Sequence, residues 1–96
     1  MEPELNSKEM TNLFKAVLQL KTVGECRKFF RDICTYSELE SMNERLQVAK
    51  YLNAKISYRI ISKKTGSSTA TVTRVAHWLH HGMGGYRLVL ERLNSH

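Results

Sequence analysis

Several features that would mark a secreted or membrane protein are scarce in this sequence. It has 96 residues with one proline and two cysteines, and no apolar run approaches the roughly 18 to 20 residues that a membrane-spanning helix needs. The first ten residues are polar and acidic, whereas a secretory signal starts basic and continues apolar. These absences predict a cytoplasmic protein without a membrane segment, in which Cys26 and Cys34 are free thiols.

Groups that would support catalysis are scarce as well. After residue 44 the only carboxylate is Glu91, which leaves no pair there for general acid–base chemistry. The glycines at 82–85 lack the strand and the lysine of a phosphate-binding loop. His77 and His81 have a spacing that can serve one metal ion, but no third ligand is evident, and we interpret them as part of a polar helix face. We expect no catalytic residue, no metal and no cofactor.

Acidic residues are scarce in the second half of the chain, and this gives the protein its charge. The net charge is +6. Residues 1–50 carry eight basic and eight acidic residues, whereas residues 51–96 carry seven basic residues and one acid. A basic field on part of a small domain attracts polyanions, of which nucleic acid is the commonest. A solvated basic surface without a partner is the alternative interpretation.

The pattern of caps and apolar residues predicts an all-α fold with about six helices in one domain, residues 1–96. With its one proline at position 3, the chain can form uninterrupted helices from about residue 6. Asn6, Thr22 and Thr35 are each followed three residues later by glutamate, the signature of a helix start. Apolar residues recur at helical spacing downstream, and the third helix is expected over about Tyr36 to Asn53.

The last expected helix, Tyr86 to Leu93, carries its apolar residues along one side. A helix of this length is not stable alone in water, so its apolar side must be buried against another surface. That surface belongs either to its own domain or to a second chain.

The run ISYRIISKKTGSSTATVTRVAHWL, residues 56–79, has the outline of a helix-turn-helix. One helix start is expected at Ser57 and another at Ser67 or Ser68, with Gly66 between the two helices. Glycine ends a helix easily because it adopts a positive φ, and serine caps the helix that follows.

In a helix-turn-helix the second helix lies in the DNA major groove, so its first exposed residues must be small and able to face base edges. We expect base contacts from Thr69, Ala70 and Thr73. The opposite, core-facing side is expected to carry Val72, Val75 and Ala76.

The protein groups that bind DNA phosphates are mostly basic side chains and free N–H groups at helix starts. The residues that we expect to contact phosphate are Arg59, Lys63, Lys64 and Ser68. A plain helical hairpin has the same outline, however. The competing function is therefore a helical protein-interaction module whose basic surface binds an acidic protein partner.

This run, together with the upstream TYSELESMNERLQVAKYL, resembles the tryptophan repressor superfamily, and especially its YerC/YecD-like branch of small bacterial proteins. The resemblance covers about residues 33–93. Its most specific part is GSSTATVTR, a glycine turn followed by the A-T-x-T-R word of the family's recognition helix.

The resemblance implies an intertwined homodimer that binds double-stranded DNA and regulates transcription as a repressor. It divides the chain into a helical dimerisation part at 6–55, a helix-turn-helix at 56–81 and a C-terminal helix at 86–94. In such a dimer the N-terminal helices and the last helix interlock between the two chains, and a small chain gains the core that it lacks alone.

The resemblance also implies a small-molecule effector pocket. The residues that match the tryptophan-binding positions are Thr35, Arg45, Thr71 and Arg74. A carboxylate held by arginine and an indole held between side chains are chemically reasonable in such a pocket. The tryptophan binder, however, has glycine where this chain has Val75, and a branched side chain there obstructs an indole. We therefore expect the pocket to be empty, filled by side chains, or suited to another small molecule, with tryptophan as the less favoured effector.

Overall fold

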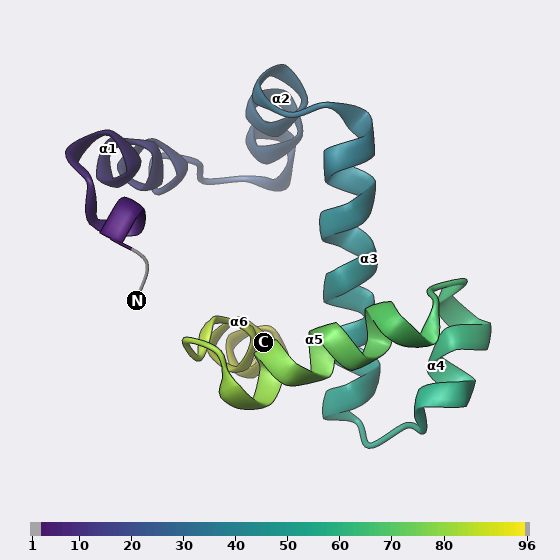
Figure 1. Ribbon diagram of the computed structural model, residues 1–96. Coiled ribbons are helices and arrows are strands. Elements are labelled where there is room, and N and C mark those ends of the chain that lie inside the picture. The colour runs from purple at the N-terminus through teal and green to yellow at the C-terminus, as the bar shows by residue number, and fades with distance from the viewer. Residues whose placement is uncertain (1–2, 96) are drawn as a thin grey trace. The chain divides into compact units, whose positions relative to one another are not determined.

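The computed structural model describes residues 3–95, which form six α-helices and a short 3-10 helix, with no strand among them (Figure 1). The elements are η1 (Pro3–Asn6), α1 (Lys8–Val17), α2 (Val23–Ile33), α3 (Tyr36–Asn53), α4 (Tyr58–Thr65), α5 (Thr69–His81) and α6 (Gly85–Asn94). The predicted all-α fold is confirmed, and α3 has the predicted bounds. Over the described range, no helix has the length and apolar character that a bilayer span requires.

The chain divides into two compact units, residues 1–36 and 37–96. In the first unit the cap of α1 differs from the prediction. The cap is Ser7, whose Oγ accepts a hydrogen bond from the N–H of Met10 at 3.0 Å. Asn6 ends η1 instead, and the extended backbone of Ser7 is the conformation that an N-cap needs.

The cap of α2 is the predicted Thr22, whose Oγ1 accepts from the N–H of Glu25 at 3.0 Å. The side chain of Glu25 reaches back past the cap to the residue before it. Its Oε1 accepts from the N–H of Lys21 at 2.8 Å rather than from that of Thr22. The two hydrogen bonds satisfy N–H groups on both sides of the cap, and the predicted helix start is confirmed.

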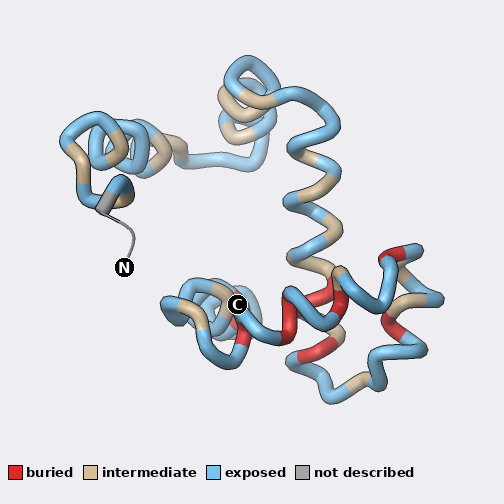
Figure 2. The backbone as a smooth tube through the Cα atoms, viewed as in Figure 1, coloured by how far each residue is buried: buried red, intermediate tan, exposed pale blue. Residues whose placement is uncertain are grey.

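Neither α1 nor α2 has a buried residue (Figure 2). Several large apolar side chains of this unit are exposed, among them Leu13, Phe14, Leu18, Val23 and Ile33. Leu18 is 78% exposed. Because exposed apolar area of this extent is unfavourable in water, these two helices need a further surface to cover them.

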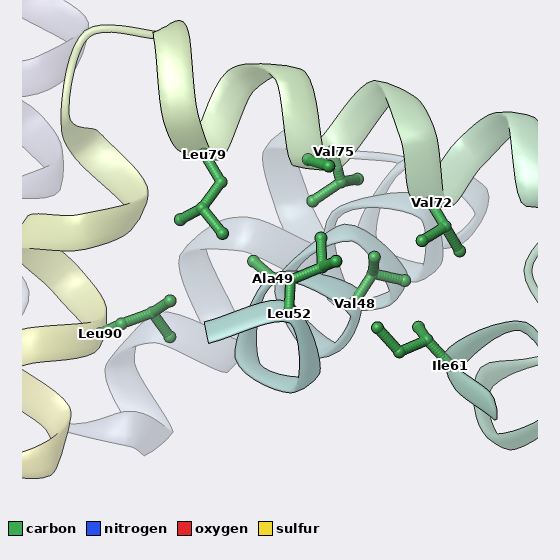
Figure 3. Close-up of a cluster of buried hydrophobic side chains, with 9 residues drawn as sticks. Val48, Ala49, Leu52, Ile61, Val72, Val75, Leu79 and Leu90 are labelled. Atoms are coloured by element: carbon green, nitrogen blue, oxygen red, sulfur yellow. The ribbon is translucent and has the colours of Figure 1, made fainter. Parts of the chain in front are cut away.

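The second unit contains the hydrophobic core (Figures 2 and 3). It is formed by the last turns of α3 with one side each of α4, α5 and α6. Its residues are Val48, Ala49, Leu52, Ile61, Val72, Val75, Ala76, Leu79 and Leu90. The predicted core-facing side of α5 is thereby confirmed. The last helix contributes the buried Leu90 and the partly buried Tyr86 to this core, while its Leu88, Val89 and Leu93 are exposed.

The end of α3 sets the direction in which the chain enters α4. Lys55 has a left-handed backbone with φ 65°, and the N–H of Ile56 donates to the carbonyl oxygen of Tyr51 at 3.1 Å. The N–H of Lys55 donates to the carbonyl oxygen of Leu52 at 3.0 Å. This pair of bonds is a Schellman motif, with Ile56 packed against the core after it.

Candidate nucleic-acid interface

Helices α4 and α5 pack against each other and are joined by a three-residue turn. At its start α4 is capped by Ser57, whose Oγ accepts from the N–H of Ile60 at 3.4 Å. It ends at Gly66, which has a left-handed φ of 74° and donates its N–H to the carbonyl oxygen of Ser62. Ser68 caps α5 by accepting from the N–H of Thr71 at 3.1 Å. The predicted helix starts and the predicted glycine turn are confirmed.

Ser67, in the middle of this turn, is only 3% exposed, and all three of its polar groups have partners. Its N–H donates to Thr65 Oγ1 at 3.2 Å, and its carbonyl oxygen accepts from Ser62 Oγ. Its own Oγ donates to Glu44 Oε1 of α3 at 2.5 Å. Sequence reasoning considered Ser67 only as a cap and missed Glu44, because no spacing rule links residues 23 positions apart.

The two sides of α5 differ as the sequence predicts. Val72, Val75, Ala76 and Leu79 are buried. The three residues expected to contact bases, Thr69, Ala70 and Thr73, are all exposed in the first turns of the helix. The exposed side of α5 therefore carries small side chains, and the opposite side of the same helix is packed in the core. Their contact with DNA remains a prediction.

The residues expected to contact phosphate are also exposed. Arg59, Lys63 and Lys64 lie on α4, and Lys64 Nζ lies 5.8 Å from the centre of the Tyr51 ring. A cation at this distance from an aromatic ring is attracted to its face. Ser68 is exposed too, but its hydroxyl is engaged at the helix start, since it also donates to Thr71 Oγ1 at 3.1 Å. The main chain is therefore the part of Ser68 best suited to meet a phosphate.

A cavity of about 530 Å³ lies in the second unit, between α3, α5 and α6. Its lining residues are Ser41, Glu44, Arg45, Thr71, Arg74, Val75, Trp78 and Tyr86. Three of the four predicted effector residues, Arg45, Thr71 and Arg74, are brought together here. Thr35 belongs to the first unit and is not part of the lining.

The cavity wall combines two guanidinium groups, one carboxylate and two aromatic side chains. Arg45 Nε donates to the carbonyl oxygen of Ser41 at 3.2 Å, one turn earlier on its own helix. Val75 is only 2% exposed, so the same side chain packs in the core and forms part of the wall. Sequence reasoning did not find Trp78 or Tyr86, because their place in this wall depends on how three helices meet.

The histidines of α5 are exposed, with the rings of His77 and His81 5.5 Å apart between centres. Arg87 of α6 donates from Nε to the carbonyl oxygen of Leu79 at 3.1 Å, and its Nη2 lies 3.3 Å from Nδ1 of His80. These contacts join α6 to the end of α5. Within residues 3–95, no group of three or more histidine, cysteine or acidic side chains is arranged to hold a metal ion.

The comparisons with known proteins agree with this architecture. The family described as Trp repressor protein matches residues 8–94. The protein YerC of Bacillus subtilis (strain 168) is 41% identical over 92 residues, which are 96% of this chain and 88% of YerC.

Two solved structures are also similar. A TrpR-like protein from Eubacterium eligens ATCC 27750 superposes with a TM-score of 0.93 at 42% identity, over 97% of this chain and 96% of that one. A Staphylococcus aureus protein described as a candidate Trp repressor gives 0.90 at 40% identity, over 95% and 91% of the two chains. The chain therefore belongs to the Trp repressor family and is a YerC-like member of it.

Proposed function

We propose that this protein is a homodimeric, sequence-specific DNA-binding regulator of bacterial transcription that acts as a repressor in the cytoplasm. The observation that carries the proposal is the α4–α5 pair, in which the first turns of α5 expose Thr69, Ala70 and Thr73 above a core in a chain of the Trp repressor family. A rigid helix with small exposed residues at its start suits entry into the major groove.

The chemistry of these side chains suits direct readout of base pairs. A threonine hydroxyl can donate to or accept from a base edge, and the methyl groups of threonine and alanine can contact the methyl group of thymine. Arg59, Lys63 and Lys64 on the neighbouring helix supply positive charge for the phosphate backbone, together with the N–H groups at the start of α5.

The exposed apolar residues support a homodimer as the active form. Leu13, Phe14 and Leu18 of the first unit, and Val89 and Leu93 of α6, expose large apolar side chains. A second copy of the chain would cover these side chains and enlarge a core of nine buried apolar residues. Two copies would also present two recognition helices to the half-sites of a palindromic site.

A small-molecule effector in the cavity is a separate proposal. Arg45 and Arg74 offer guanidinium groups to a carboxylate, and Trp78 and Tyr86 offer aromatic surfaces. Val75 is part of the cavity wall, at the position that matches a glycine in the tryptophan binder, and a branched side chain there takes up space; we therefore propose that the occupant is not tryptophan.

The function is tested by selecting duplexes from a random pool with the full-length protein and measuring the mass of the complex. We expect palindromic sites and two chains per duplex. Thr69→Ala should then relax the preference at one base pair and weaken binding to the selected site by about tenfold, the scale of one base contact. Recovery of no duplex at low salt, with an acidic protein bound instead, would favour the interaction-module alternative.

A further inference from the structure

We propose that Glu44 is a positioning residue for DNA recognition, which holds the turn before α5 in place through the hydroxyl of Ser67. The inference rests on the proposed DNA-binding function. It goes further by giving a role to a side chain that lies on α3, outside the helix-turn-helix.

The three hydrogen bonds of Ser67 come from different parts of the molecule. Its N–H and its carbonyl oxygen bond to Thr65 and Ser62, which both belong to α4. Only the Oγ bond to Glu44, at 2.5 Å, reaches the central helix of the core. The α4 bonds fix the shape of the turn, whereas the Glu44 bond fixes its place relative to α3.

The place of this turn decides where the reading residues lie. Ser67 directly precedes Ser68, the N-cap of α5, and Thr69 follows at the first helical position. Recognition geometry must hold within about 0.5 Å, so a shift of the turn moves Thr69 and Ala70 relative to a base edge. The buried side of α5 begins only at Val72, which leaves the first turn dependent on its polar contacts.

The charge of Glu44 strengthens this bond. A hydrogen bond to an ionised acceptor is roughly twice as strong as one between neutral groups. Because Glu44 also lines the cavity beside Arg45, its carboxylate is in a wall that contains positive charge. Glu44→Gln keeps an oxygen that can accept from Ser67, whereas Glu44→Ala removes the acceptor.

The experiment measures affinity for a selected duplex and for an unrelated duplex in four variants: Glu44→Ala, Glu44→Gln, Ser67→Ala and the double alanine variant. Glu40→Ala is the matched control, because it removes an exposed carboxylate one turn earlier on α3. Amide hydrogen exchange at Ser67, Thr71 and Val72 reports directly on the turn, since these N–H groups bond to Thr65 Oγ1, Ser68 Oγ and the Ser68 carbonyl oxygen.

We expect Glu44→Ala to weaken binding to the selected duplex by about tenfold or more, the effect of losing a hydrogen bond to a charged group. Affinity for the unrelated duplex should stay within about twofold, because that binding depends on phosphate contacts. Glu44→Gln should bind the selected duplex about threefold more weakly than the wild type, because its neutral amide oxygen accepts about half as strongly as the carboxylate. Ser67→Ala should match Glu44→Ala, and the double variant should be no weaker than either one.

Faster exchange at the three amides should accompany the loss in Glu44→Ala and not in Glu40→Ala. Additive losses in the double variant, equal losses on both duplexes, or unchanged exchange would overturn the positioning role. If Glu44→Ala does not fold, Ser67→Ala and Glu44→Gln decide the same question. If the wild-type protein binds no duplex, the proposed function fails, whereas the exchange comparison still tests the link between Glu44 and the turn.

Discussion

The hydroxyl of Thr73 donates a hydrogen bond to the main-chain carbonyl oxygen of Thr69 at 2.9 Å, one turn earlier on α5. Threonine often makes this bond within a helix, and it directs the hydroxyl toward the helix itself. The methyl group of Thr73 is then the part of this exposed side chain that is left for a partner. The two threonines expected to read DNA therefore offer different groups.

This difference predicts unequal effects for two substitutions at position 73. Thr73→Val keeps the methyl group and should leave affinity for the selected duplex within about twofold. Thr73→Ser removes the methyl group and should weaken it by about fourfold, since one buried methylene contributes roughly 0.8 kcal/mol. Fluorescence anisotropy with labelled duplexes distinguishes the two. The reverse order would mean that the hydroxyl, and not the methyl group, contacts the base.

Lys63 and Lys64 are expected to contribute charge without sequence preference. Lys63→Glu with Lys64→Glu should weaken binding to all duplexes by a similar factor. Each lost phosphate contact should lower the slope of log K against log salt by about 0.9. A titration series across salt concentrations measures this slope.

The control for the lysine pair changes the same charge elsewhere. Lys8→Glu with Lys15→Glu places two acidic residues on exposed positions of α1, in the first unit. We expect this pair to leave the slope nearly unchanged. An equal decrease for both pairs would show that net charge matters and that Lys63 and Lys64 have no special position.

The features that the sequence predicted correctly are those with local causes. Ser57, Gly66 and Ser68 act through hydrogen bonds and φ values within a few residues, so local pattern predicts where α4 begins and ends and, to within one residue, where α5 begins. The buried side of α5 follows equally from helical spacing. The prediction at Asn6 was wrong by one residue, because η1 continues through Asn6 and leaves Ser7 as the extended residue.

The features that were missed depend on contacts between distant segments. Glu44 meets Ser67 only because α3 passes beside the turn, and no local pattern marks this pair. Arg45 and Arg74 both line the cavity, as the resemblance implies. Trp78 and Tyr86 line it together only because α6 packs on α5, and no local pattern predicts that packing. The left-handed Lys55 was not foreseen, since lysine gives no signal for a positive φ.

An exposed apolar residue at the end of α1 predicts how the proposed dimer can be weakened. Leu18, the C-cap of α1, is 78% exposed, the highest value among the large apolar side chains within the described part of the chain. If a second copy covers it, Leu18→Glu places a charge in an apolar interface and should raise the dimer dissociation constant by more than tenfold. Gln19→Glu adds the same charge at the next exposed residue and should have little effect. Light scattering should give twice the chain mass of 11.1 kDa for the wild type, and a single-chain mass at equal concentration would contradict the dimer.

The left-handed backbone of Lys55 predicts a substitution that stabilises the fold. A residue with a Cβ atom loses about 1 kcal/mol or more in this conformation, and glycine does not. Lys55→Gly should therefore raise the free energy of unfolding, although the greater freedom of glycine in the unfolded chain offsets part of the gain. A net gain of about 0.5 kcal/mol would raise the melting temperature by about 2 to 4 °C in a domain of this size.

Lys55→Ala keeps the Cβ atom and should give no such increase. Thermal unfolding followed by circular dichroism measures both variants, and equal melting temperatures for glycine and alanine would show that the Schellman motif at the end of α3 imposes no such cost.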